Sequence, residues 1–90
     1  MLALRGEIDV AALDDARTLL LRGIVCEPHP DGVIEIDCSE LEFIDSSGLG
    51  MLVGVHKKTG VKLVLLDVPE QCRPVFRVTQ LDQLFELRDT

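Results

Sequence analysis

The residues with the greatest capacity for chemistry lie in one short run, Asp45-Ser46-Ser47-Gly48-Leu49-Gly50. A carboxylate precedes two hydroxyls at the start of an expected helix, and two glycines follow early in that helix. Each glycine inside a helix costs about 1 kcal/mol relative to alanine, so some other requirement must offset the loss. One interpretation is close packing together with capping by a serine. The other is that the glycines leave no side chains projecting from the helix backbone there, so that a second protein can approach an exposed serine.

The residues around these hydroxyls do not favour catalysis. A serine hydrolase needs a base, an orienting acid and an oxyanion hole. Ser46 lacks the Gly-x-Ser-x-Gly elbow, and His56 lies further along the same helix, on its expected core face. We therefore interpret His56 as a packed core histidine and expect a protein that is not an enzyme.

Metal and nucleotide sites are disfavoured as well. Cys26 and His29 lie in one loop without a second pair of ligands, whereas a structural zinc site normally has four. The chain also lacks a glycine-rich Walker loop with its lysine. We expect no bound metal and no cofactor.

The helix that follows Asp45 has two sets of apolar residues. Its expected core face has the spacing i, i+3, i+4 and i+7 and consists of Leu49, Leu52, Val53 and His56. Met51 and Val55 form a second pair, four residues apart and off that face. Either this pair is partly buried, or it provides an adaptable contact surface beside the serines. Both interpretations stay open.

Periodicity along the chain predicts strands and helices in alternation. The expected strands cover residues 2–5, 33–38, 61–66 and 84–87. Three helices are expected. The first follows Asp9 as its N-cap, the second covers residues 47–59, and the third begins at Pro69. The first helix has a buried face of Leu13, Ala16, Leu20 and Ile24, and the second strand has one of Ile34, Ile36 and Cys38.

This order of elements predicts an α/β fold. Repeated strand–helix–strand units give a mostly parallel or mixed sheet with right-handed crossovers. Ninety residues leave room for one domain, so we expect a single domain over residues 1–90 with about four strands and about three helices.

Composition narrows the function further. A net charge of −7 repels phosphate backbones, and the chain has no Trp, no Tyr and three Phe for stacking on bases. We therefore expect no nucleic-acid partner. The apolar run from Val61 to Val68 is interrupted by Lys62 and Asp67, far short of the 18 or more residues of a membrane span. No membrane partner is expected.

The three cysteines fit a cytoplasmic protein. The N-terminal apolar stretch is too short for a signal peptide, so we expect the chain to remain in the cytoplasm. Cys26, Cys38 and Cys72 are then interpreted as reduced thiols, and their odd number leaves one unpaired in any scheme of disulfides within the chain.

Several segments resemble one known family. Four segments resemble the STAS domain of bacterial anti-sigma factor antagonists. They are Leu4-Arg5-Gly6-Glu7-Ile8-Asp9, Asp37-Cys38-Ser39, the run from Phe43 to Gly50 and the tail from Val78 to Asp82. The likeness covers nearly the whole chain in the same order and with similar spacing. Its central motif is long enough to be specific.

The resemblance implies a phosphorylation switch. In this family the unphosphorylated antagonist binds an anti-sigma factor that is also a serine kinase, and this frees a sigma factor. The kinase phosphorylates the first serine after the motif aspartate, which corresponds to Ser46, and a PP2C-type phosphatase reverses the modification. The residues that the resemblance places at or near the contact are Asp9, Asp45, Ser46, Ser47, Gly48, Leu49 and Gly50. Met51 and Val55 are added from the helix pattern.

The chain departs from the family pattern in three places. Family members usually carry a further strand before the Gly-Glu-Ile-Asp segment, and we expect this strand to be missing. An unprotected sheet edge would then invite self-association, as in a homodimer, or pairing with another chain. A truncated or misassigned start of the sequence is the alternative explanation. Pro74 should kink or delay the third helix, and Gln80 stands where a glycine is common.

A second class of function competes with the antagonist. It is a STAS-type sensory or scaffold module that binds a small ligand or a partner protein outside a sigma pathway. An intact Asp45-Ser46-Ser47-Gly48 motif favours the antagonist, because a scaffold needs no phosphoacceptor.

Overall fold

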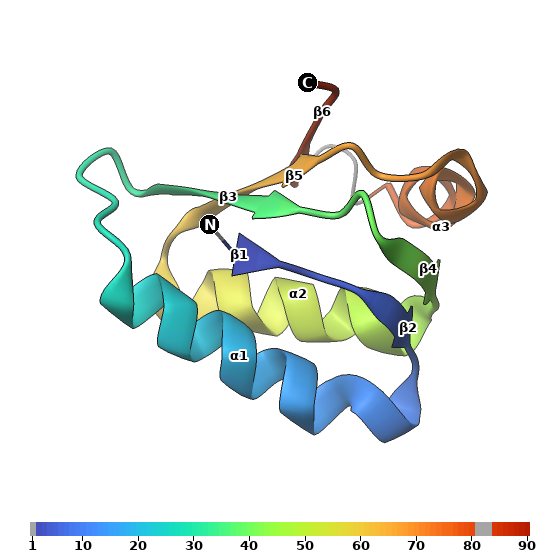
Figure 1. The fold of residues 1–90 in the computed structure, drawn as a ribbon, viewed down its shortest axis with the longest axis horizontal. Coiled ribbons are helices and arrows are strands. Elements are labelled where there is room, and N and C mark those ends of the chain that lie inside the picture. The colour runs from blue at the N-terminus through green and yellow to red at the C-terminus, as the bar shows by residue number, and fades with distance from the viewer. Residues whose placement is uncertain (1, 81–83) are drawn as a thin grey trace.

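The computed structural model describes residues 2–80 and 84–90, and it has the predicted α/β architecture (Figure 1). Its strands are β1 (Leu2–Ala3), β2 (Gly6–Ile8), β3 (Val33–Asp37), β4 (Leu41–Ile44), β5 (Lys62–Leu66) and β6 (Glu86–Arg88). Its α-helices are α1 (Leu13–Cys26), α2 (Ser46–Thr59) and α3 (Arg73–Val78); the short 3-10 helices η1 (Val10–Ala12) and η2 (Glu70–Cys72) precede α1 and α3. Leu81 and Asp82 of the family-like tail lie outside the described residues.

The strands pair in parallel, as predicted. One sheet has the order β1-β3-β5-β6, and β2 pairs with β4 beside it. Strand β1 leads into β2, and β3 leads toward β4. Residues 2–8 therefore run alongside residues 33–44, with β1 paired to β3 and β2 paired to β4 (Figure 1). Residues 2–8 therefore form one edge of the whole sheet.

Two details of the strands differ from the prediction. The strand predicted over residues 2–5 covers only Leu2–Ala3, and a second strand that was not predicted, β2, begins at Gly6, which has a φ of +69° and a register shift after it. The strand β4 was not predicted. Its first and last residues are buried and the two between them are exposed, so the sequence does not alternate as a half-buried strand would.

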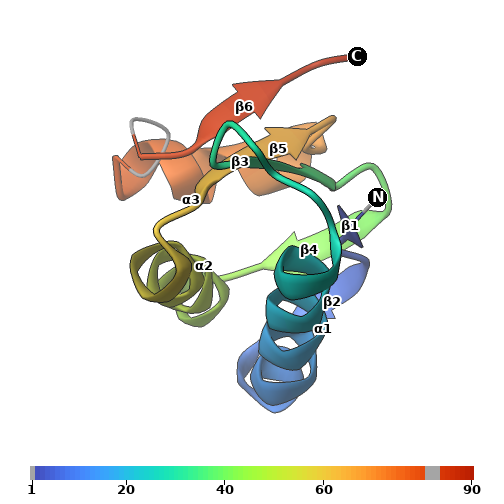
Figure 2. The same ribbon diagram turned by 90° about the vertical axis from the view of Figure 1, so that its left-hand side faces the viewer.

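Helices α1 and α2 lie side by side against the sheet, as Figures 1 and 2 show. The predicted faces are confirmed: the buried residues include Ala16, Leu20, Ile24, Ile34, Ile36 and Cys38, whereas Leu13 is half-buried. Within the described residues, no helix is long and apolar enough to cross a membrane. Much of the core therefore lies between the sheet and these two helices, and Cys72 of η2 and Phe76 of α3 belong to the same core cluster.

Strand β5 is covered on both faces, as its continuous apolar run predicted. It pairs with β3 on one side and β6 on the other, and Leu63, Val64, Leu65 and Leu66 are all buried. Burying one such side chain stabilises a fold by about 1.5–3 kcal/mol relative to leaving it exposed. Strand β5 is thus a large contributor to the stability of the domain.

The region of the third helix shows how its prolines are accommodated. Pro69 precedes the 3-10 helix η2, and α3 begins only at Arg73. Pro74 lies in the first turn of α3, where a missing N–H breaks no helical hydrogen bond. The predicted delay of the helix is confirmed, and the alternative of a kink is wrong. Gln80 follows with a φ of +60°, a conformation in which glycine is usual.

The three cysteines are free thiols, as predicted. Cys38 and Cys72 are buried, whereas Cys26 is exposed. Burial, with smaller contributions from nearby Asp37 and Cys72, raises the pKa of the Cys38 thiol to about 12. Cys38 is therefore a small core residue and not a nucleophile at neutral pH.

A hydrogen-bonded clamp joins the end of β5 to the C-terminal residues. Asp67 adopts a φ of +56°, and its N–H donates to the carbonyl of Arg88 over 2.8 Å. Its carboxylate accepts hydrogen bonds from the Thr90 hydroxyl, over 2.5 Å, and from the Thr90 N–H, over 2.8 Å. These two hydrogen bonds lower the pKa of Asp67 below its usual value, and the bond from the Thr90 hydroxyl has the larger effect.

We expect Asp67→Asn to lower stability at neutral pH and to flatten its dependence on acid. A carboxyl group whose pKa is lowered in the folded state stabilises the fold above the unfolded-state pKa of about 3.9. That contribution is lost as pH falls through the folded-state pKa. Asparagine tolerates the positive φ, so the substitution mainly removes the charge. Urea unfolding at neutral and at acidic pH measures the difference; a gap between wild type and variant that does not narrow in acid would contradict the clamp.

Candidate functional site

The candidate site begins where β4 ends at Ile44 and α2 starts at Ser46. Between them, Asp45 is extended and acts as the N-cap of α2. Its Oδ1 accepts hydrogen bonds from the N–H of Ser47 over 3.0 Å and from the N–H of Gly48 over 3.1 Å. The cap is therefore the aspartate, and the interpretation that a serine caps the helix is wrong.

The two serines of the motif differ in access. Ser46 is the first residue of α2 and is exposed, whereas Ser47 is half-buried. The N–H of Ser47 is already bonded to Asp45. An enzyme that modifies a hydroxyl at this helix start would therefore reach Ser46 more readily than Ser47.

Asp9 occupies a position equivalent to that of Asp45 on the neighbouring strand. Strand β2 pairs with β4 in parallel, with Ile8 opposite Ile44. Asp9 and Asp45 each follow the carboxyl end of their strand, so both lie at the same end of the sheet. Asp9 also caps a helix, because its Oδ1 accepts from the N–H of Ala12 over 3.2 Å. The expected proximity of Asp9 to the motif agrees with this pairing.

The two glycines of the motif have different surroundings. A Cβ on Gly48 would lie 2.6 Å from Cγ1 of Ile44 and 3.0 Å from the carbonyl oxygen of Ile8. Gly48 is therefore required for close packing of α2 onto the ends of β2 and β4. A Cβ on Gly50 would meet nothing within 4 Å, and Gly50 is exposed. Packing within the domain gives no reason for Gly50.

Met51 and Val55 are not a surface pair. Their side chains are 4% and 2% exposed, and both belong to the core cluster. The interpretation that they form a contact surface beside Ser46 is therefore wrong for this chain on its own, and the burial interpretation is correct. Helix α2 packs against both the sheet and α1, so its buried arc is wider than one stripe. Leu49 is buried as well and can only support a contact from beneath.

The exposed side of α2 near its start is made of small residues. Ser46, Gly50 and Gly54 follow one another at intervals of four and therefore lie on one face of the helix. All three are exposed, and a Cβ on Gly54 would also meet nothing within 4 Å. We call this surface the small-residue face of α2. Gly54 was missed from the sequence, although its spacing from Gly50 and Ser46 could have identified it.

His56 has a structural role, as predicted. Its Nδ1 lies 2.8 Å from the carbonyl oxygen of Val61, just past the end of α2. Its ring is half-buried and meets Phe85 edge to face, with 6.4 Å between ring centroids. The histidine thus ties the end of α2 to the following strand and to the C-terminal segment.

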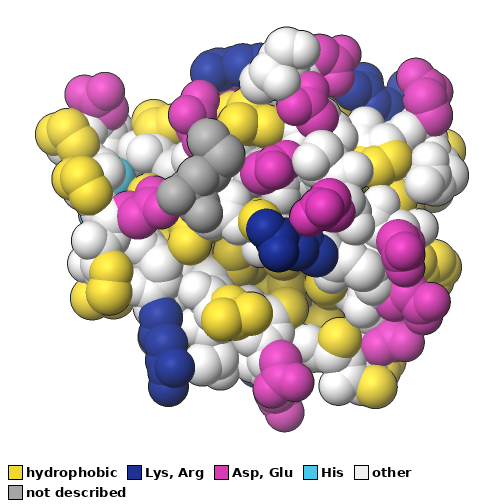
Figure 3. Space-filling model, in the orientation of Figure 1, with side chains coloured by type: hydrophobic (Ala, Val, Ile, Leu, Met, Phe, Trp, Pro, Cys, Tyr) yellow, Lys and Arg dark blue, Asp and Glu magenta, His cyan; other side chains and the backbone are white. Residues whose placement is uncertain are grey.

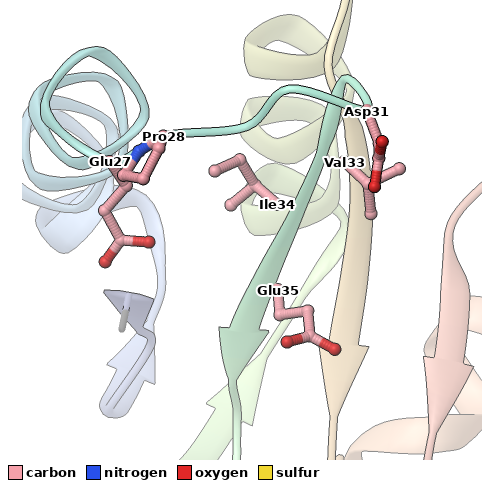
Figure 4. A pocket seen from close by; sticks show the side chains of 6 residues that line it. All are labelled: Glu27, Pro28, Asp31, Val33, Ile34 and Glu35. Atoms are coloured by element: carbon pink, nitrogen blue, oxygen red, sulfur yellow. The ribbon is translucent and has the colours of Figure 1, made fainter.

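The surface hollow of about 500 Å³ shown in Figure 4 lies at the other end of the sheet. It is formed between the end of α1 and the beginning of β3, and its lining residues are Glu27, Pro28, Asp31, Val33, Ile34 and Glu35. Ser46 instead follows the carboxyl end of a strand. Over residues 2–80 and 84–90, no group of three or more His, Cys, Asp or Glu side chains is placed to hold a metal ion.

Comparison with known proteins identifies the family. A family model described as the STAS domain matches residues 1–90. The chain belongs to the STAS domain family. It is also similar to two proteins named Anti-sigma-B factor antagonist, from Listeria monocytogenes serovar 1/2a and Listeria innocua serovar 6a, each 32% identical over 60 residues. The match covers 63% of this chain and 53% of each relative, so the chain spans about half the length of the curated relatives it matches.

The two motif glycines should respond in opposite ways to alanine. Gly50→Ala should raise the free energy of unfolding by about 0.5–1 kcal/mol, because helix propensity improves and the new methyl group enters open space. Gly48→Ala should lower it by about 1–2 kcal/mol, because the methyl group would overlap Ile44 and the Ile8 backbone. Urea unfolding of both variants measures the two changes. Equal effects would contradict the packing described for this STAS domain.

Proposed function

We propose that this STAS domain is a cytoplasmic anti-sigma factor antagonist. In its unphosphorylated form it binds an anti-sigma factor that is also a serine kinase and so frees a sigma factor; phosphorylation of Ser46 ends the binding. The name that both Listeria relatives carry supports the antagonist role. The observation that carries the proposal is the exposure of Ser46 at the first position of α2, directly beside the capping carboxylate of Asp45.

The contact with the kinase centres on the small-residue face of α2. Ser46, Gly50 and Gly54 present almost no side-chain volume, so a partner can approach the helix backbone closely. Asp45 and Ser47 are half-buried beside Ser46, and Asp9 lies at the end of the neighbouring strand. The buried Gly48 and Leu49 hold this surface from below.

The position of the Asp45 carboxylate explains why a phosphate at Ser46 would oppose binding. A free helix N-terminus attracts a phosphate, because its N–H groups point outward. Here Asp45 already accepts hydrogen bonds from two of those groups, at Ser47 and Gly48. A phosphate on Ser46 would therefore stay on the surface next to a carboxylate and would not replace the cap.

The energy required is within reach of a single phosphate. Moving a complex from 99:1 bound to 1:99 takes about 5.5 kcal/mol of differential affinity. A phosphate adds a charge of about −1.5 to −2 at neutral pH, and it would have to be desolvated against the partner close to Asp45 and Asp9. Burying such a charge without compensation costs several kcal/mol. The switch then works by repulsion at the interface, with little change inside the domain.

The partners in this proposal are proteins. They are the anti-sigma factor kinase and a PP2C-type phosphatase that restores Ser46. The net charge of −7 opposes a role in binding nucleic acid. The domain itself acts by binding and supplies the substrate hydroxyl, not the catalytic groups.

The proposal is tested by incubating the purified protein with ATP and each anti-sigma factor kinase encoded in the same genome. Intact-mass spectrometry should show the gain of one phosphate in the wild type and in Ser47→Ala, and no gain in Ser46→Ala. The two variants are matched controls, since they remove adjacent hydroxyls that differ in exposure. If no kinase transfers phosphate, the second class of function, a STAS-type sensory or scaffold module, replaces the antagonist.

Ser46→Asp should bind the kinase at least about tenfold more weakly than the unphosphorylated wild type does, a difference of about 1.4 kcal/mol. The melting temperature should change little, because Ser46 is exposed and Asp45 keeps its cap. Calorimetric titration and thermal unfolding measure the two quantities. Unchanged affinity, or a large fall in melting temperature, would contradict a switch by interface repulsion.

A further inference from the structure

The phenyl ring of Phe43 is exposed, unlike the other two phenyl rings of the chain. The sequence has three Phe and neither Trp nor Tyr. Phe76 and Phe85 are each 1% exposed, whereas Phe43 is 46% exposed. A buried aromatic ring is one of the largest single contributions to a core, and Phe43 makes only part of that contribution. Packing within the domain therefore does not account for an aromatic residue at this position.

Phe43 points away from helix α2. Strand β4 pairs with β2 in parallel, and Phe43 lies opposite Glu7. The next pair in the register, Ile8 and Ile44, is buried and packs against Gly48 of α2. Successive side chains of a strand point to opposite faces, so Glu7 and Phe43 share the outer face of this strand pair. Their exposure agrees with that position.

Carboxylates surround the ring. Glu7 stands beside it on the neighbouring strand, and paired strands lie about 4.7–4.9 Å apart. Glu42 comes directly before Phe43, and Asp45 follows two residues later. Neither Glu7 nor Glu42 has an ion-pair partner among residues 2–80 and 84–90. Figure 3 shows acidic side chains gathered at the right of the view, over the part of the sheet where Figure 1 places β2 and β4.

A guanidinium group fits this combination of ring and carboxylate. Its flat face stacks on an aromatic ring, while its N–H groups donate to a carboxylate at its edge. It is also more weakly hydrated than an ammonium group, so it loses less when a contact excludes water. A wholly apolar pocket over Phe43 would instead leave the Glu7 carboxylate desolvated without a partner. The surface is therefore better suited to arginine than to lysine or to an apolar side chain.

We propose that Phe43 and Glu7 form a docking site for an arginine of the kinase that phosphorylates Ser46. The site extends the contact from α2 around the end of the sheet onto the outer face of β2 and β4. It rests on the proposed antagonist function, and Phe43 and Glu7 are additions to the contact residues described above.

One partner can reach both the ring and the serine. Phe43 precedes Ser46 by three residues, so their Cα atoms are at most about 11 Å apart. A standard interface covers about 800 Å² on each partner and is wider than this distance. Helix α2 packs on the side of β4 that Ile44 faces, whereas Phe43 points to the other side. A phosphate on Ser46 therefore stays next to Asp45 and away from this arginine.

The ring is tested by titrating unphosphorylated variants, in a calorimeter, with the kinase that phosphorylates the wild type. Phe43→Ala should bind at least about tenfold more weakly, whereas Phe43→Tyr keeps a ring and should stay within about threefold of wild type. Val25→Ala is the matched control and should bind as the wild type does, because Val25 is 84% exposed near the end of α1, at the opposite end of the sheet. Thermal unfolding should show every variant fully folded at the temperature of the titration.

The charge is tested with a pair of variants that each remove one carboxylate. Glu7→Gln should weaken binding at least about threefold, because the arginine loses its partner. Asp31→Asn removes the same charge from an exposed position at the other end of the sheet and should change the affinity little. Equal weakening by both variants would mean general attraction between oppositely charged proteins and would overturn the site. Weaker binding of Phe43→Ala with unchanged binding of Glu7→Gln would assign an apolar pocket in place of the arginine.

A double variant shows whether one arginine makes both contacts. Once Phe43→Ala has removed the ring, adding Glu7→Gln should weaken binding by less than about twofold more, because the two residues share a partner. Effects that simply multiply would mean two separate contacts and would contradict a shared arginine.

The results also distinguish the docking site from the proposed function. If the wild type is phosphorylated on Ser46 and Phe43→Ala binds the kinase with wild-type affinity, the antagonist function stands and the arginine site is overturned. If no kinase phosphorylates the wild type, the antagonist function fails and the arginine site fails with it.

Discussion

The carboxylate of Asp45 is the constraint on which the arrangement of the motif depends. By accepting hydrogen bonds from two successive N–H groups, it fixes the start of α2 directly after β4. That start leaves Ser46 outside and turns Gly48 down onto Ile8 and Ile44. The glycine can approach so closely only because it has no side chain, and a shift of one residue in the helix start would place Ser47 or Leu49 there. The cap, the exposed hydroxyl and the close packing therefore all depend on the same helix start.

Much of the fold could be predicted from periodicity, because most elements bury one clear face. Helix α1 buries a single stripe, and β5 is apolar throughout because both its faces are covered. The failures occurred where two neighbours share an element. Helix α2 packs against the sheet and α1 together, so Met51 and Val55 join the core beside the stripe that spacing identified. Strand β4 has two exposed residues in succession, which hides it from an alternation rule.

The site was less predictable than the fold, for a physical reason. Residue types identified the motif, but serine and aspartate are both good helix caps, and only coordinates show which side chain accepts the hydrogen bonds. The two glycines were equivalent in sequence, yet one is held by contacts of 2.6 and 3.0 Å and the other faces open space. Gly50 therefore lowers the stability of the isolated domain without improving its packing. The proposed partner contact at the surface of α2 would account for that loss, whereas packing accounts for Gly48.

In the proposed switch, the cap also determines how a phosphate would act. At an uncapped helix start, a phosphate could bond to the free N–H groups and become part of the domain, with much of its charge compensated. Because Asp45 already holds those groups, a phosphate on Ser46 would stay uncompensated and would add to an existing negative charge. The same carboxylate that stabilises the helix would then increase the cost of desolvating the phosphate against a partner. A helix capped by a neutral serine would give a weaker switch, so the acidic cap is better suited to control by phosphorylation than to stability alone.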